Sequence, residues 1–322
     1  MQKGQNGAVT PSPQSLVQKK IRKDSLPFIY TKLFLTAVFW GGTFIAGRIV
    51  AKDAGPFSAA FLRFAIASIF LLFITLRIEG KLPLVKRGQI IPVILLGMTG
   101  VFAYNVFFFK GLKIIEAGRA SLIIANNPIF ITLFASFFFK EKLNPLKVTG
   151  IIISVIGAII VISRGNLIEI LNGNVGWGEF YIFCCVLTWV AYTLIGKAIM
   201  TNLSPLVSVS YSAIVGAVAL FIPAYFEGMI QDLVNYSSAD WFGIFYLGFF
   251  GTVLGFVWYY QGIKTIGPMK ASQFINFVPI SAVLLAFFIL SEPITLSLLV
   301  GAIFVISGVY LTNTTAIVLK KN

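Results

Sequence analysis

The sequence predicts an all-α integral membrane protein with ten transmembrane helices, arranged as two inverted repeats of five helices. Three observations carry this prediction: the composition, ten apolar runs of spanning length, and a repeat that relates the first five runs to the last five. Of the 322 residues, 58% are hydrophobic and 11% are charged, against about 25% charged in a typical soluble domain. The composition therefore excludes a soluble globular protein.

The ten apolar runs are bounded by charged residues, proline or glycine. A helix needs about 20 largely apolar residues to cross about 30 Å of hydrocarbon. Continuous apolar runs favour helices over strands, because a lipid-exposed segment must satisfy its own backbone hydrogen bonds. The predicted spans are residues 33–51, 58–76, 90–109, 117–139, 148–163, 177–196, 205–225, 241–260, 272–290 and 296–313.

The charge distribution predicts how the chain is oriented. Residues 1–28 are polar and carry a basic cluster around Lys19 and Arg22, which predicts a disordered cytoplasmic tail rather than a cleaved signal peptide. Most lysines and arginines fall on the same side as this tail, which predicts cytoplasmic N- and C-termini. We expect a bacterial plasma (inner) membrane. The predicted divisions are a first repeat over 29–164, an extracytoplasmic linker over 165–176, a second repeat over 177–315 and a cytoplasmic tail over 316–322.

The missing residue types exclude several functions. The chain has a net charge of +14 but no continuous basic face, so we expect no nucleic acid partner. It has no histidine, which removes histidine-based catalysis and most zinc, copper or iron sites. Adjacent Cys184 and Cys185 lie in an apolar run and predict helix packing. We therefore expect no enzyme activity, no metal and no other cofactor.

A shift of the chain by 151 residues superimposes one part on another. Gly100 then aligns with Gly251 and Pro128 with Pro279, while a shift of 149 aligns Trp40 with Trp189. Because five is an odd number of spans, the second copy enters the membrane from the opposite face. Secondary transporters use such inverted repeats recurrently, so the repeat favours a transporter over a structural bundle. Further aligned pairs are Gly97 with Gly248, Gly111 with Gly262, Ser121 with Ser272, Glu141 with Glu292, Gly150 with Gly301, Gly157 with Gly308 and Pro56 with Pro205.

These motifs resemble the drug/metabolite transporter superfamily and, within it, the ten-helix EamA family, over residues 33–313. The resemblance implies a transporter, commonly an exporter of amino acids or other small metabolites, with a cavity lined mainly by helices 1, 3, 4, 6, 8 and 9. The second copy departs from the first in having Ser212 at the position of Arg63. The motifs are Trp40-Gly41-Gly42-Thr43-Phe44, Pro56 followed by Arg63, Ala120-Ser121 before Pro128, Glu141 before Gly150 and Gly157, and their counterparts Ala271-Ser272, Pro279, Glu292, Gly301 and Gly308.

Polar and aromatic side chains inside the spans are the candidate substrate-binding residues. An unsatisfied amide or hydroxyl in hydrocarbon is costly, so such groups face a cavity or a partner helix. Tryptophan usually anchors at the membrane interface. Trp40 and Trp189 instead lie within spans, where they either stack on a solute or fill volume. The candidates are Trp40, Thr43, Tyr104, Asn105, Asn127, Trp189, Tyr192, Tyr259, Gln273 and Asn276.

Three further residues are singled out by their chemistry. Pro128 and Pro279 each remove an intrahelical hydrogen bond, which either presents a carbonyl to the cavity or produces a kink that can act as a gate. Arg63 is a charge within a span; it binds an anion, holds helices together or reaches the membrane surface. The family resemblance favours the architectural role. Glu141 and Glu292, at span ends, are interpreted as structural.

The sequence thus predicts a secondary transporter that exports a small metabolite, such as an amino acid, by alternating access. No acidic residue lies near the middle of a span, so we expect facilitated transport or exchange, or coupling through Glu179 or Glu292. A phosphorylated-metabolite or nucleotide-sugar antiporter is an alternative that should place several basic residues at midspan. A non-transporting membrane subunit is another. The expected partners are a small-molecule substrate and the lipid bilayer, with monomer and homodimer both open.

Overall fold

The structure, a computed structural model, describes residues 26–139, 145–166, 176–199, 203–266, 271 and 273–318; the side chains of 135–139, 197–198, 273 and 312–318 fall outside this description. Throughout these residues the regular structure is helical, which confirms the predicted all-α class. Residues 1–25 of the predicted N-terminal tail, most of the linker, and Glu141 lie outside the described residues, whereas residues 26–28 belong to the first described helix.

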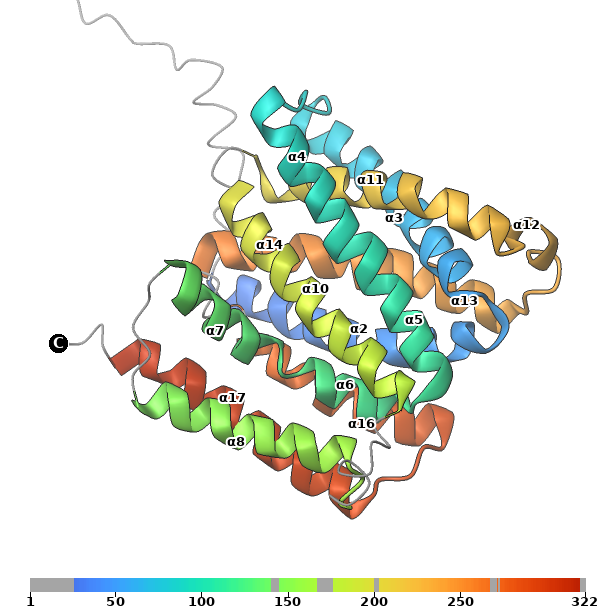
Figure 1. The fold of residues 1–322 in the computed structure, drawn as a ribbon. Coiled ribbons are helices and arrows are strands. Elements are labelled where there is room, and N and C mark those ends of the chain that lie inside the picture. Colours follow the sequence, from blue (N-terminus) through green and yellow to red (C-terminus); the bar gives the residue numbers. More distant parts are fainter. Residues whose placement is uncertain are drawn as a thin grey trace, which may run out of the picture.

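The described part of the first half forms five helical stretches that are long and apolar enough to span a membrane (Figure 1). Two of them are interrupted. The third changes from α-helix to the wider π-helix, and the fourth breaks into two helices. The elements are α2 (Leu26–Asp53), α3 (Pro56–Glu79), α4 (Arg87–Leu96) with η1 (Gly97–Ala103) and α5 (Tyr104–Ile114), α6 (Ala117–Ile124) with α7 (Asn127–Phe139), and α8 (Pro145–Ile162).

The second half repeats this plan. Eight helical stretches across the described residues are long and apolar enough to span a membrane, and the ten predicted spans are reached only with two shorter apolar helices, Phe274–Leu290 and Leu296–Leu311. The elements are α10 (Trp177–Ile199), α11 (Pro205–Phe226), the short α12 (Met229–Asp232), α13 (Ser238–Tyr246) with η2 (Leu247–Leu254) and α14 (Gly255–Ile266), η3 (Gln273–Asn276) with α16 (Phe277–Leu290), and α17 (Leu296–Val318).

The two π-helical segments occupy equivalent places in the repeat. The 151-residue shift places η1 on residues 248–254, within η2. A π-turn holds one more residue than an α-turn and is frequent at functional sites. The two segments therefore occupy equivalent positions along the third helical stretch of each half.

Helices of one half pack mainly on helices of the other. In Figure 1, α3 lies beside α11, and α8 lies along α17 at the opposite side of the molecule. α2 packs on α14 and α16, and its counterpart α10 packs on α5, α6 and α7. Glycine permits the closest approach: a Cβ on Gly157 would lie 2.6 Å from the Val305 backbone N, as expected where small residues mediate helix contacts in lipid.

Carboxylates of one half accept hydrogen bonds at the N-termini of helices in the other half. Glu227, directly after α11, accepts hydrogen bonds from Ser58 N at 2.6 Å and Ser58 Oγ at 2.7 Å, at the start of α3. Glu79, at the end of α3, accepts one from Ser204 Oγ at 2.9 Å, at the N-cap of α11. Glu292 accepts from the backbone N–H groups of Ala117 and Gly118. Negative charge at a helix N-terminus is favourable, so these contacts support the structural interpretation of Glu292, and its role in coupling stays a prediction.

Candidate functional site

A small cavity lies between the two halves. Its volume is about 50 Å³, enough for one or two water molecules. A metabolite therefore requires the walls to move apart. The first half contributes Trp40, Thr43, Phe44, Arg63, Tyr104, Phe108, Ile124 and Asn127, and the second half contributes Trp189, Phe256, Ile275 and Val278.

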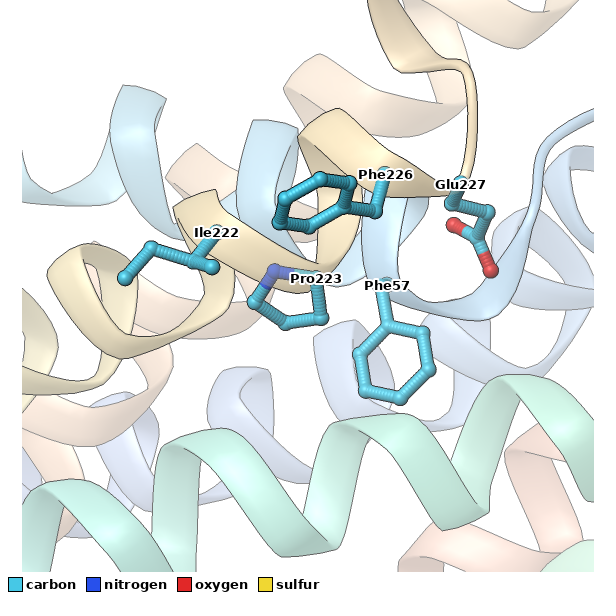
Figure 2. A pocket seen from close by; sticks show the side chains of 5 residues that line it. All are labelled: Phe57, Ile222, Pro223, Phe226 and Glu227. Atoms are coloured by element: carbon cyan, nitrogen blue, oxygen red, sulfur yellow. The ribbon is translucent and has the colours of Figure 1, made fainter.

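A larger hollow, of about 520 Å³, lies at the ends of α3 and α11 (Figure 2). Phe57, Ile222, Pro223 and Phe226 line it, and Phe226 is 81% exposed. Its acidic group, Glu227, is already engaged by Ser58. On a membrane protein, an exposed apolar groove of this kind is a surface for lipid rather than a polar solute.

The two π-helical segments position polar groups around Arg63. Arg63 Nη1 donates to Asn105 Oδ1 at 2.8 Å, and Arg63 Nε donates to Thr252 Oγ1 at 3.1 Å. Asn105 Nδ2 in turn donates to the carbonyls of Gly100 and Val101, and Thr252 Oγ1 donates to the Leu247 carbonyl. Because Asn105 lies in the first half and Thr252 in the second, one guanidinium joins both halves.

Arg63 carries an uncompensated charge. It is 4% exposed, and within the described ranges no carboxylate lies within ion-pair distance of it. Arg119, which is equally buried, pairs with Glu179 at 3.3 Å. A buried cation without a counter-ion is costly, and this cost separates Arg63 from the other buried arginine.

Two adjacent asparagines have different surroundings. Asn126 Nδ2 donates to the carbonyls of Leu122 and Ile123, and Asn126 Oδ1 accepts from Ser154 Oγ at 2.9 Å. Asn127 lines the cavity and is 3% exposed, and its Oδ1 has no hydrogen-bond partner among the described residues. The structure thus separates a satisfied structural amide from an unsatisfied amide at the cavity.

Aromatic rings form much of the cavity wall. Trp40 Nε1 donates to the Gly251 carbonyl at 2.9 Å, inside η2. The Trp40 ring meets Trp189 edge-on, with centroids 5.8 Å apart, and Trp189 contacts Tyr104 at 5.3 Å. Edge and tilted contacts at these separations are favourable for aromatic pairs. The two repeat-related tryptophans therefore meet at the interface of the halves.

Helix interruptions precede both predicted prolines. The break between α6 and α7 falls just before Pro128, and η3 turns into α16 just before Pro279. At the first break, the carbonyls of Leu122 and Ile123 are satisfied by Asn126 within the same span. These two carbonyls are therefore not offered to a solute, while the role of either proline as a gate remains a prediction.

The cavity brings together six of the residues singled out from the sequence, namely Trp40, Thr43, Arg63, Tyr104, Asn127 and Trp189. Asn105 is not among the lining residues, but it accepts a hydrogen bond from Arg63, which is. Tyr192 and Tyr259 are buried in the adjoining aromatic cluster. Asn276 is half-buried and does not line the cavity, and the Gln273 side chain is outside the description. Substrate contact by all of these residues stays a prediction.

Sequence reasoning missed Thr252 and the apolar part of the lining. Thr252 is a polar residue within an apolar run, and that signal could have identified it. The apolar lining residues have no comparable signal, because they resemble any other apolar residue of a span. They are Phe44, Phe108, Ile124, Phe256, Ile275 and Val278.

The chain is similar to a family of transporters and to proteins named as uncharacterized transporters. The model of the EamA-like transporter family matches residues 28–163 and 176–314. An uncharacterized transporter of Bacillus subtilis, YyaM, is 32% identical over 281 residues, covering 87% of this chain and 92% of that protein. An uncharacterized transporter of Archaeoglobus fulgidus is 31% identical over 87% of this chain and 96% of that protein. One solved crystal structure matches with a TM-score of 0.62 and 18% identity, covering 91% of this chain and 99% of that one.

Proposed function

Because the chain belongs to the EamA-like transporter family, we propose that it is a secondary transporter that exports a small polar metabolite, such as an amino acid, by alternating access. One observation carries this proposal: the cavity is built from both repeat-related halves and lies where their helices are interrupted. A site at the interface of two such halves becomes accessible from one side or the other when the halves reorient.

The apolar helices and the family make this an integral membrane protein. We propose that it resides in a bacterial plasma membrane with both termini in the cytoplasm. The asymmetry of basic residues in the sequence supports this orientation. The repeat-related positions Lys81 and Ile230 would then face opposite sides.

The cavity chemistry supports exchange or facilitated transport. Arg63 is the charged residue of the described cavity lining, and the lining contains no carboxylate. A proton relay of the usual carboxylate type therefore has no counterpart there. A phosphorylated substrate would call for more than one cation to match its charge, so the lining favours a substrate of lower charge.

The decisive test uses the purified protein in proteoliposomes. A thermal-shift screen of amino acids, organic acids, amines and nucleobases identifies candidate ligands, and flux of each stabilising compound is then measured. We expect saturable, protein-dependent flux that is stimulated by the same compound on the opposite side. Ligands that stabilise the protein but never move would favour the non-transporting subunit instead.

Labelling tests the inverted arrangement separately. Lys81→Cys and Ile230→Cys, each in a Cys184→Ser/Cys185→Ser background, should react with a membrane-impermeant thiol reagent from opposite faces. Reaction of both positions from the same face would contradict inverted halves. It would also remove the symmetry argument for alternating access.

A further inference from the structure

The buried charge of Arg63 has hydrogen-bond partners but no counter-ion among the residues that the structure describes. Asn105 Oδ1 and Thr252 Oγ1 are neutral acceptors, so they satisfy two guanidinium N–H groups without cancelling the charge. Removing a charge from water costs far more than neutral hydrogen bonds return. A mobile anion at the cavity would complete the site.

The remaining guanidinium N–H groups have a way to reach such an anion. Arg63 lines the cavity together with Thr43. A Cβ built on Gly251 would lie 2.6 Å from Thr43 Cγ2 and 3.6 Å from Arg63 Nη2. Arg63 Nη2, for which no hydrogen bond is recorded within the described structure, and Thr43 thus both lie close to Gly251.

Asn127 provides a second, independent observation. Its Oδ1 is buried and unpartnered among the described residues, and Asn127 lines the same cavity. A buried acceptor without a donor costs about 1–3 kcal/mol. A ligand that brings its own N–H or O–H group would remove that cost.

Together these groups define the chemistry of the ligand. On the basis of the proposed transport function, we infer that the substrate is a small organic acid whose carboxylate binds Arg63 and whose hydroxyl or amino group donates to Asn127. A positive charge on the substrate is dispensable, because the described lining offers it no carboxylate. Hydroxy acids and amino acids therefore qualify, and amines do not.

Binding of matched compounds tests this inference. The probes are lactate, alanine, propionate and ethylamine, and their phenyl-substituted counterparts 3-phenyllactate, phenylalanine, 3-phenylpropanoate and 2-phenylethylamine. In at least one series, we expect the hydroxy acid and the amino acid to bind best, the plain acid less well, and the amine at least about tenfold more weakly than the acids. Thermal shift and calorimetry on detergent-solubilised protein measure this order.

Two variants separate the two contacts. Arg63→Gln should abolish the preference for acids over amines, whereas Arg63→Lys should retain it with lower affinity, since lysine keeps the charge but not the planar fork. Asn127→Val should remove the advantage of the hydroxy acid over the plain acid and leave the preference for acids intact. Melting temperatures of the ligand-free variants establish that each is folded.

Arg119→Gln is the matched control. Arg119 is as buried as Arg63, but it pairs with Glu179 and lies outside the cavity lining. Its replacement should lower the melting temperature without altering ligand preference. If Arg63→Gln preserves the preference for acids, or if Arg119→Gln removes it equally, the inference is overturned.

Flux separates this inference from the proposed function. Proteoliposomes that move amines or nucleobases but neither bind nor move any acid would overturn the carboxylate inference and leave a transporter. Protein that binds the acids in the expected order without moving them would support the subsite and contradict transport. Absence of binding by all acids would overturn the subsite.

Discussion

The two halves share a scaffold but line the cavity with different chemistry. Arg63, Asn105 and Asn127 of the first half correspond to Ser212, Phe256 and Val278 of the second. Within the described lining, the first half supplies the charged and amide groups together with several aromatic rings, whereas the second half supplies only aromatic and aliphatic residues. A duplicated fold can provide two equivalent conformations, while substitutions at equivalent positions give each wall its own role.

The scaffold itself remains closely paired. Gly100 and Gly251 lie in the two π-helical segments, and each faces a residue from the first span of the opposite half, Tyr192 and Thr43 respectively. Tyr192 and Thr43 are themselves equivalent under the 149-residue shift. The difference between the halves therefore concerns side chains at the cavity rather than how the helices meet.

Exchanging the charge between halves should give the largest effect on stability. Ser212 is 1% exposed, and Ser212→Arg would bury a guanidinium where the equivalents of Asn105 and Thr252 are Phe256 and Val101. We expect a loss of about 3–5 kcal/mol, measured as loss of folded, monodisperse protein in detergent. Arg63→Ser should cost less, and equal tolerance of both changes would contradict the division between the walls.

Adding a methyl group to the π-helical segments tests the shared scaffold. A Cβ on Gly251 would lie 2.6 Å from Thr43 Cγ2, so Gly251→Ala should cost about 1–3 kcal/mol. Thr43→Ser removes that methyl and keeps the hydroxyl, so the double variant should recover most of the melting temperature. The methyl group that Gly100→Ala adds would meet the Tyr192 ring, so this variant should lose a comparable amount of stability. If the melting temperature of the double variant does not recover, the contact with Thr43 Cγ2 does not cause the loss of stability.

The adjacent asparagines sharpen the comparison within the first half. Asn126→Ala should lower stability by about 1–3 kcal/mol, because it removes the hydrogen bonds of the Asn126 amide with Ser154 Oγ and with the Leu122 and Ile123 carbonyls. Asn127→Ala should leave the ligand-free protein no less stable, since Asn127 Oδ1 has no described partner to lose and its unpartnered burial is itself costly. Thermal unfolding of the two variants checks this, and a reversed order would contradict the assignment.

The smallest expected effects concern the carboxylates that join α3 and α11. Glu227→Gln weakens two hydrogen bonds to buried Ser58 and should cost about 1–2 kcal/mol. Glu79→Gln acts at an exposed pair with Ser204 and should cost less than about 0.5 kcal/mol. Unfolding in graded denaturant at low and high salt measures both. Equal costs would indicate that burial does not govern these bonds.

Much of the fold could be predicted from composition and repetition. Long apolar runs are sufficient to predict spanning helices, and the aligned prolines mark where two of the spans are interrupted. The π-helical segments could not be predicted, because Gly97–Ala103 and Leu247–Leu254 look like ordinary apolar helix. No residue type distinguishes the wider turn from an α-turn.

The candidate site could be predicted only in part, for a related reason. Polar residues within spans were easily found, but whether one faces a cavity or a partner depends on the rotation of its helix. Asn105 lies in the first turn of the α-helix that follows a π-helical segment, and its amide hydrogen-bonds with Arg63 and two carbonyls. Asn127 was selected for the same chemistry and does line the cavity.

The crossed carboxylates of α3 and α11 constrain how the molecule can move. Each helix holds the beginning of the other through a glutamate at its own end. Sliding by a single turn, about 5.4 Å, would break both attachments at once. Rotation about an axis that runs between the two helices, parallel to them, would keep both. In the proposed alternating access, this antiparallel pair is therefore expected to stay together while other helix contacts between the halves change.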